Sequence, residues 1–338
     1  MQNPFSDLLA EKGYLLADGA TGTNLFNMGL MSGDAPEFWN EEKPDNIRKL
    51  YRGSIDAGSD LFLTNSFGAN ASRLKLHDAG HRAYELSKIA AELGREEVDK
   101  ESRTILVAGS VGPTGEIMGE AGTLSHETAV EMFEETAKGL MDGGADILYV
   151  ETISAIEEFK AVAEAFGNIN APWLGTMSFD TAGRTMMGLT SENMVELVNE
   201  LDHKPTAFGA NCGVGASDLL RTILGMTNAN PDQPLIAKAN AGIPKYVDGN
   251  IVYDGTPELM ADYAVMVRNA GATVIGGCCG TLPEHLAKMR IALDENPIEA
   301  APDHDEIQSR FGSFSSETDG TGCGCSAPKR RPRRRRRA

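Results

Sequence analysis

Eight short apolar runs recur along the chain, and each passes into a glycine-rich or polar turn and then into a stretch of helical periodicity. The runs cover residues 13–23, 59–70, 104–115, 145–154, 172–180, 206–215, 234–244 and 272–281. Between them, apolar residues recur at spacings of three and four, the period of a helix with one buried face. Two such faces comprise Ile47, Leu50, Tyr51 and Ile55, and Val130, Phe133, Ala137 and Leu140. The pattern predicts strands that alternate with helices.

The ends of the helical stretches support this alternation. Three stretches close with a small residue and a glycine directly before the next apolar run, at 57–58, 143–144 and 270–271. A terminal glycine can adopt the left-handed conformation that stops a helix. The expected N-caps include Ser125, Ser191 and Thr256, and Thr256 is followed by a proline suited to the first helical position.

Alternating strands and helices form parallel βαβ units, and their right-handed crossovers place the helices on one side when the sheet closes. Eight units before residue 300 match a (β/α)8 TIM barrel. A doubly wound open sheet fits less well, because the first turn, DGATGT at 18–23, lacks the dinucleotide-binding fingerprint. We therefore expect residues 1–300 to form the barrel. The sequence turns polar from about Asp303, and residues 301–338 are expected to be a disordered, cysteine-containing and arginine-rich tail.

The composition is that of a soluble globular protein, with 41% hydrophobic and 24% charged residues. The first residues lack the basic start and apolar core of a signal peptide, and no window holds the roughly 18 apolar residues of a membrane span. Five cysteines at uneven spacing do not suggest a disulfide framework. We expect a cytoplasmic protein.

The charge is unevenly distributed. The formal net charge is −18, but residues 329–338 carry eight positive charges and no acid, so the residues before them carry −26. The tail is expected to be a solvated arm, with a docking or tethering role as the alternative. A nucleic-acid-binding protein is a poor match, since the body is acidic and shows no interleaving of aromatic and basic residues. Cys323 and Cys325 are expected to be solvated as well, so that truncation after about Ser313 would leave activity unchanged.

Active sites of such barrels form at the carboxyl ends of the strands. The residues at these ends are Asp18, Thr64, Asn65, Ser110, Glu151, Ser178, Asp180, Asn211, Cys212, Asn240, Cys278 and Cys279. Three of the five cysteines therefore fall on one face, from the sixth and eighth strands. Cys278 and Cys279 would point to opposite sides of a regular strand, but the neighbouring glycines let the backbone turn both sulfurs to one point.

Several interpretations of these residues stay open. Three thiolates suit a tetrahedral zinc site with one open position, at which a substrate thiol would be deprotonated. Glycines at the eighth strand equally suit a phosphate site, and buried cysteines are common in cores. Asp18 and Glu151 are explained as well by capping of the following helices, and Asn211 and Asn240 by fixing loops. A hydrolase or lyase would need histidine or carboxylate ligands, and the six histidines (77, 81, 126, 203, 285 and 304) all lie away from strand ends.

The sequence resembles the homocysteine S-methyltransferase family over residues 13–289. The shared motifs, in the family's order, are DGATGT (18–23), ETI (151–153), GANCG (209–213), NAGIP (240–244) and GGCCGT (276–281). Within the family it is more similar to the homocysteine-binding barrel of cobalamin-dependent methionine synthase than to betaine–homocysteine methyltransferase. The segments GSVGPTG (109–115), GRTMMGLT (183–190) and 240–261 carry that closer match.

The resemblance implies Zn²⁺ on Cys212, Cys278 and Cys279, with the homocysteine sulfur in the fourth position. It implies that Asp18 and Glu151 hold the substrate ammonium and that backbone amides around Gly19 and Ala20 hold its carboxylate. Further implied contacts to homocysteine come from Thr152, Asn211 and Asn240. The activated substrate thiolate would attack the donor methyl group to form methionine, and no protein base is assigned.

The methyl donor is expected to be methylcobalamin on a separate corrinoid protein, which would make the chain one part of a split methionine synthase. The alternative is betaine or another onium donor such as S-methylmethionine, which an aromatic cage would recognise. Thr152 and Gly68 stand where betaine-dependent relatives carry aromatics. Phe38, Trp39 and Phe67 remain candidate members of a cage.

Overall fold

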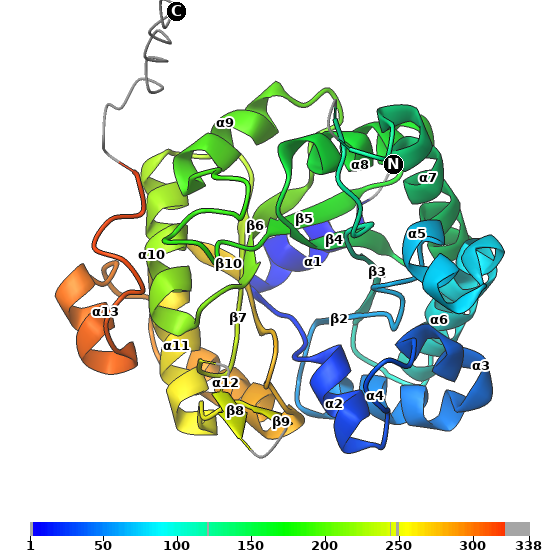
Figure 1. Cartoon of the computed structure of the whole chain (residues 1–338). Helices are drawn as coiled ribbons and strands as arrows, with labels where there is room; N and C mark the ends of the chain where they lie inside the picture. Colours follow the sequence, from blue (N-terminus) through cyan, green and yellow to red (C-terminus); the bar gives the residue numbers. More distant parts are fainter. Residues whose placement is uncertain (1–2, 120–121, 244, 248–249, 322–338) are drawn as a thin grey trace, which may run out of the picture.

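Eight parallel strands surround a common centre, with helices outside them (Figure 1). The computed structural model describes residues 3–119, 122–243, 245–247 and 250–321. The strands of this sheet are β1 (Leu15–Leu16), β2 (Leu61–Leu63), β3 (Leu106–Val111), β4 (Ile147–Ile153), β5 (Trp173–Met177), β6 (Ala207–Cys212), β7 (Leu235–Ala239) and β10 (Ala272–Gly277). Their order is β1-β10-β7-β6-β5-β4-β3-β2. Each strand lies inside one of the predicted runs, and the TIM barrel is confirmed.

The helices follow the strands in the predicted alternation. They are α1 (Pro4–Lys12), α2 (Thr21–Asn27), α3 (Trp39–Glu42), α4 (Pro44–Asp56), α5 (Ala71–Leu74), α6 (Ala83–Val98), α7 (His126–Asp142), α8 (Ile156–Asn168), α9 (Ser191–Glu200), α10 (Ala216–Asn228), α11 (Pro257–Asn269), α12 (Pro283–Glu295) and α13 (His304–Phe311). Short 3₁₀ turns are Pro36–Phe38, Lys75–His77 and Gly80–Arg82, and a small hairpin pairs β8 (Lys245–Val247) with β9 (Asn250–Val252). No helix within the described residues is long and apolar enough to cross a membrane.

The helix termini follow the predicted chemistry with one shift. Ser125 and Thr256 cap α7 and α11 by accepting from the third following amide. The cap of α9 is Thr190, whose hydroxyl accepts from the Asn193 amide, so Ser191 is instead the first helical residue. The glycines of the three predicted stops, at 58, 144 and 271, all have φ near +94° to +111°.

The inside of the barrel is an apolar layer that α1 covers at the amino-terminal end. Phe5 and Leu8 of α1 are buried against aliphatic side chains that point inward from the strands, among them Leu15, Leu61 and Ile236. In Figure 1, α1 lies behind the ring of strands, so the carboxyl ends of the strands face the viewer. The open end of the barrel is therefore the carboxyl end, where an active site is expected.

A buried acid joins β1 to β2, the two ends of the strand order. The Asp60 amide donates to the Leu16 carbonyl at 2.6 Å, and the Asp60 carboxylate accepts from the Leu16 amide at 2.8 Å. The same carboxylate contacts Lys12 at 2.5 Å and Arg290 at 3.1 Å. Since Asp60 is 1% exposed, these partners replace the water that its charge loses on folding.

The segment after the barrel differs from the disorder expected from Asp303 onward. Asp303 caps α13 in a capping box with Glu306, and Ile307 of α13 is fully buried. Residues 312–321 continue along α10. The polar composition hid this order because it does not reveal that Ile307 and Phe314 reach the core, or that polar groups of α10 hydrogen-bond the segment. Cys323, Cys325 and the arginine-rich run lie outside the described residues, and the predicted division at residue 300 stays a prediction.

Candidate functional site

Three thiols meet at the carboxyl ends of the strands. Cys212 is the last residue of β6, and Cys278 and Cys279 directly follow β10. All three sulfurs lie within 4.8 Å of one another, and those of Cys212 and Cys279 are 3.9 Å apart. The thiols are free and partly buried. The structure thus brings together the three cysteines that the sequence placed on one face.

The backbone leaves strand geometry at both thiol segments. Cys212 has a φ of 62°, a left-handed conformation that costs a non-glycine residue about 1–3 kcal/mol. After β10, the Cys278 amide still donates to the Ala239 carbonyl at 2.7 Å, whereas the Cys279 amide donates to the side chain of Asn240 at 3.1 Å. Gly280 follows with a φ of 79°. Both sulfurs of the vicinal pair therefore turn toward Cys212.

Asn211 fixes a second strained position beside the thiols. Thr152, at the end of β4, has a φ of 63°, and its amide and hydroxyl contact the two polar atoms of Asn211 at 2.9 and 2.8 Å. The Asn211 amide nitrogen also lies 3.7 Å from the Cys278 sulfur. Asn211 is fully buried. Its side chain joins β4, β6 and the segment after β10, which matches the loop-fixing interpretation.

Asn240 links the two thiol segments to each other. Its Oδ1 accepts from the Cys279 amide at 3.1 Å, and its Nδ2 donates to the Gly213 carbonyl at 2.9 Å. Because Gly213 follows Cys212 directly, a single buried side chain sets the spacing between the two segments. Both polar atoms of Asn240 are engaged within the protein, as are those of Asn211.

The sulfurs influence one another's ionisation. Hydrogen bonds from Cys212 first, and from Cys278 second, lower the pKa of Cys279. The hydrogen bond with Cys278 is the largest cause that raises the pKa of Cys212. The Tyr253 hydroxyl also hydrogen-bonds the Cys279 sulfur and favours the thiolate. One thiolate is thus stabilised by its neighbours, but further thiolates at this spacing repel it unless a cation lies between them.

A buried ion pair lies beneath the thiols. Lys238 of β7, 2% exposed, donates to Asp18 Oδ1 at 2.6 Å, and Asp18 Oδ2 accepts from the Leu63 amide at 2.9 Å. Burial lowers the pKa of Lys238, but Asp18 and the other nearby anionic groups raise it by more, so it lies above its ordinary value. Lys238 remains an ammonium inside the barrel. Both oxygens of Asp18, predicted to bind the substrate ammonium, already have partners.

Glu151 occupies the neighbouring strand end. Its Oε1 accepts from the Ser110 hydroxyl at 2.6 Å, and the side chain is partly exposed. Burial raises the pKa of Glu151 to about 7, although the Lys238 ammonium opposes the shift. This carboxyl therefore changes its charge close to neutral pH and is the acid of the site most open to a ligand.

The turn after β1, which contains Gly19 and Ala20, packs closely against Thr281. A Cβ at Gly19 would lie 2.6 Å from the Thr281 carbonyl, and the Ala20 amide donates to that same carbonyl at 3.1 Å. The Ala20 amide, which the resemblance assigns to the substrate carboxylate, is therefore engaged within the protein. The turn holds the segment that follows Cys278 and Cys279 against β1.

The other strand-end candidates have different positions. Thr64 and Ser110 form a buried network next to Glu151, in which the Ser110 amide donates to the Thr64 hydroxyl at 2.9 Å. Asn65 bonds Asn40 at 2.9 Å and positions the segment before α4. Asp180 is exposed and accepts from the Thr181 hydroxyl. These residues support the site or lie outside it.

Sequence reasoning missed two members of the site. Lys238 is the single charged residue in an otherwise apolar strand, and a charge buried in a parallel strand requires a partner, so the signal was present. Tyr253 lies in the connection between β9 and α11, where no periodicity indicates which way a side chain points. Only the folded chain brings it to Cys279.

The donor set fits a thiophilic divalent ion. Zinc sites in proteins use thiolates in tetrahedral geometry, and a catalytic site keeps three protein ligands and one open position. Three sulfurs within 4.8 Å of one another match this requirement. Asn211 donates to the Cys278 sulfur and Asn240 holds the Cys279 backbone amide, and such outer contacts fix the orientation of metal-binding side chains.

The comparison with protein families assigns this arrangement to a known group. The sequence model described as homocysteine S-methyltransferase matches residues 15–293. The chain is 27% identical over 303 residues to methionine synthase of Mycobacterium tuberculosis, covering 85% of this chain and 25% of that protein. It therefore spans about a quarter of the length of that relative.

Solved structures give the same assignment. The metallated form of the homocysteine methyltransferase MmuM from Escherichia coli superposes with a TM-score of 0.73 at 26% identity, covering 86% of this chain and 99% of that one. Its oxidized form superposes with a TM-score of 0.71. At this level the likeness includes sequence as well as the barrel.

Proposed function

The chain belongs to the homocysteine S-methyltransferase family, and we propose that it forms methionine by methylating homocysteine at the site of Cys212, Cys278 and Cys279. The observation that carries this proposal is the convergence of the three sulfurs within 4.8 Å. A zinc ion held by these three thiolates would accept the homocysteine sulfur as its fourth ligand and stabilise it as a thiolate at neutral pH. Because the thiols must stay reduced, we infer a cytoplasmic location.

The residues around the thiols align the substrate. Glu151 holds the homocysteine ammonium, since it is the acid of the site with exposed surface. Asp18 contributes negative charge nearby but shares it with Lys238. The substrate sulfur forms a bond to the donor's methyl carbon as the bond from that carbon to the donor breaks, and the thiol proton leaves to solvent. Alignment of the two reactants supplies much of the rate, and no protein base is required.

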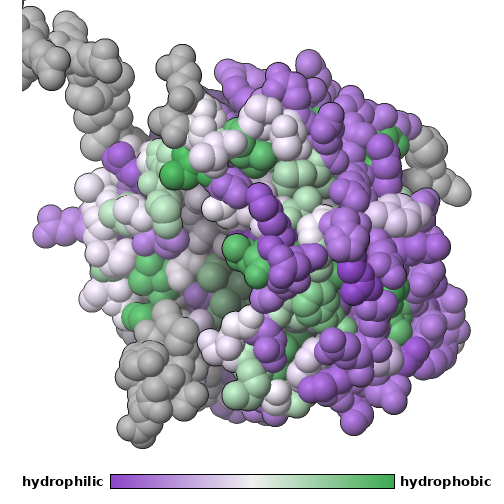
Figure 2. Space-filling model, turned by 45° about the vertical axis from the view of Figure 1, so that its right-hand side comes forward, coloured by the Kyte–Doolittle hydropathy of each residue, from purple (hydrophilic) through white to green (hydrophobic). Residues whose placement is uncertain are grey.

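We propose methylcobalamin on a separate corrinoid protein as the donor. The exposed apolar side chains favour a donor that arrives on a protein. Eight of the eleven large apolar side chains exposed among the described residues lie in connections that leave the carboxyl ends of the strands: Phe26, Met28, Met31, Leu76, Ile117, Met186, Met187 and Ile243. Figure 2 shows apolar surface bordering the hollowed part of one face, beside a largely hydrophilic helical side. Apolar surface gathered at a mouth is typical of a protein contact.

The aromatic residues argue against an onium cage. The Lys43 ammonium lies 3.9 Å from the centre of the Trp39 ring, and the Arg73 guanidinium lies 5.4 Å from that of Phe67. Phe38 packs edge-on against His77. The protein's own cations thus lie over a face of Trp39 and of Phe67, where a quaternary ammonium or a sulfonium would otherwise bind.

The second candidate is a free onium donor. Its support is that the chain covers 99% of MmuM, a homocysteine methyltransferase of barrel size. The deciding experiment supplies zinc-loaded protein and homocysteine with a methylated corrinoid protein, betaine or S-methylmethionine, and measures methionine. We expect turnover with the corrinoid protein alone. Turnover with an onium compound alone would contradict the proposed corrinoid donor. If none of the three donors yields methionine, the proposed function is wrong. Cys278→Ala serves as the inactive control.

A further inference from the structure

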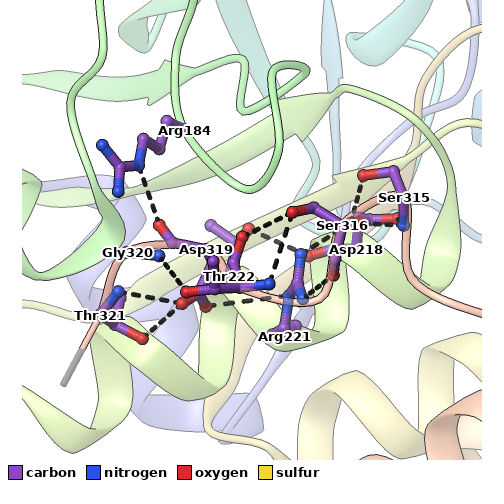
Figure 3. Close-up of polar contacts among 10 residues, drawn as sticks. Arg184, Asp218, Arg221, Thr222, Ser315, Ser316, Asp319, Gly320 and Thr321 are labelled. Carbon is purple, nitrogen blue, oxygen red and sulfur yellow. Dashed lines mark hydrogen bonds and ion pairs between the residues drawn. The ribbon is translucent and has the colours of Figure 1, made fainter. Parts of the chain in front are cut away.

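Beyond α13, residues 312–321 run along α10 and end beside the loop that follows β5. We call these residues the C-terminal strap. They lie after residue 293, where the match to the family ends. Figure 3 shows the polar contacts that attach the strap to the barrel at two places.

The first attachment is to the start of α10. The Ser315 amide and hydroxyl both donate to the Asp218 carboxylate, at 3.0 and 2.8 Å. Arg221 donates to the Ser316 carbonyl at 2.8 Å and pairs with Asp218 at 3.0 Å. Both charged side chains are 4% exposed. The strap thereby satisfies part of a buried ion pair on the helix that directly follows the Cys212 turn.

The second attachment is to the loop between β5 and α9, residues 178–190. Asp319 is 9% exposed, and its carboxylate accepts from the Thr321 amide and hydroxyl at 2.9 and 2.7 Å and lies 3.8 Å from Arg221. Its carbonyl accepts from Arg184 of the loop at 3.3 Å. A Cβ at Gly183 would lie 2.3 Å from that of Asp319, so the approach requires a glycine there.

Both attachments lead to Cys212. Helix α10 begins at Ala216, after the turn formed by Cys212, Gly213 and Gly215. The loop of residues 178–190 reaches the same turn, because the Phe179 carbonyl lies 3.3 Å from the position of a Cβ on Gly213. The strap therefore joins the two segments that flank the strained thiol.

Polar contacts, more than apolar packing, hold the strap. A cavity of about 630 Å³ lies between α10, α13 and the strap, with Arg221, Phe314 and Asp319 among its lining residues. The guanidinium of Arg221 stacks on the Phe314 ring at 4.4 Å. Since Phe314 is the one large apolar residue of the strap, the loss of single polar groups should loosen the rest of it.

We propose that the C-terminal strap fixes the position of Cys212, with Asp319 and Arg221 as positioning residues. The strap restrains the loop of residues 178–190 and the first turn of α10, and through them the left-handed turn that presents the sulfur. A displacement of a fraction of an ångström at a ligand weakens a metal site. This role is at odds with the expectation that truncation after about Ser313 leaves activity unchanged. The inference rests on the proposed function for its metal and kinetic readouts, and hydrogen exchange tests it independently.

Two truncations give a matched test. Deletion of residues 322–338 keeps the strap, and deletion of residues 312–338 removes it while leaving α13. We expect the longer deletion to speed amide hydrogen exchange in residues 178–190 and 213–219 of the metal-free protein, and to weaken zinc binding by about tenfold. Equal exchange and equal zinc affinity in the two deletions would overturn the inference. If the full chain binds no zinc, the proposed function fails, and the exchange measurement still decides the role of the strap.

Point variants guard against a general loss of folding. Asp319→Ala should reproduce the faster exchange and raise the KM for homocysteine more than it lowers kcat, because the altered turn weakens ligand positioning. Asp319→Asn keeps the acceptor for Thr321 and should restore part of the protection. Glu317→Ala, at an exposed position of the same segment, is the control and should behave as the full chain. An Asp319→Ala variant indistinguishable from Glu317→Ala would contradict the proposal.

Discussion

At the amino-terminal end of the barrel, Asp60 is surrounded by Lys12, Arg290 and the backbone of β1, and Phe5 of α1 fills the space above the inner aliphatic layer. The carboxyl end buries a comparable ion pair, Lys238 with Asp18, but there strained residues and three adjacent thiols lie beside it. At the amino-terminal end, each of these side chains has a partner. At the carboxyl end, the chain maintains left-handed residues and crowded sulfurs at a cost in stability. The stabilising contacts and the proposed site thus lie at opposite ends of one sheet.

The largest effect expected on function comes from Cys212→Ser. The variant loses one of three sulfurs, and since loss of outer contacts alone lowers metal affinity by about 10–100-fold, removal of a ligand should lower methyl transfer by at least about 100-fold. Zinc content of the purified protein and methionine formation measure this. Cys323→Ser in the tail is the matched control and should retain both. Wild-type zinc content and activity in Cys212→Ser would show that the carboxyl end does not contain the metal site.

Phe5→Ala should affect the opposite end only. Truncation of a fully buried phenylalanine leaves a cavity and costs about 3–5 kcal/mol in the free energy of unfolding. Denaturant titration measures the loss, while zinc affinity of the folded protein should stay at the wild-type value. Phe26→Ala, at a residue 54% exposed in a connection at the carboxyl end, is the comparison and should change stability little. A fall in zinc affinity in Phe5→Ala would show that the two ends are coupled.

Asn240→Ala should weaken the site without unfolding the barrel. The change removes the side chain that links the Cys279 amide to the Gly213 carbonyl, so zinc affinity should fall by about 10–100-fold. Competition with a chelator measures the affinity. Asn168→Ala removes an exposed asparagine at the end of α8 and serves as the control. Equal zinc affinity in the two variants would show that Asn240 does not support the metal site.

Glu151 should make the stability of the protein depend on pH. In the metal-free protein its pKa is raised from 4.5 to about 7, so the folded state holds the proton more tightly than the unfolded state. Stability should therefore fall as pH rises from about 4.5 to 7, by up to roughly 3 kcal/mol, and Glu151→Gln should remove this slope. Unfolding at pH 5 and pH 8 measures it, with Glu317→Gln as the exposed control. Parallel slopes in wild type and Glu151→Gln would exclude the raised pKa.

The prediction of a barrel depended on repetition, which the sequence displays directly. Apolar runs and helical faces alternate eight times, and each strand appeared within its run. The thiols were found because parallel strands bring their carboxyl ends to one face, whatever the details of packing. The cap of α9 shifted by one residue, to Thr190, since two neighbouring hydroxyls satisfy the same pattern.

Some features depended on contacts between distant segments. Asp18 is predicted to bind substrate, and the sequence did not reveal that Lys238, 220 residues away in the chain, lies against it. The strap was predicted to be disordered because its composition is polar. Composition does not show that a distant buried residue such as Asp218 hydrogen-bonds the segment. Periodicity and residue type thus determined the fold, the face of the site and its thiol chemistry. Only the tertiary structure decided which polar groups are already engaged, since that depends on which distant atoms lie within hydrogen-bonding distance.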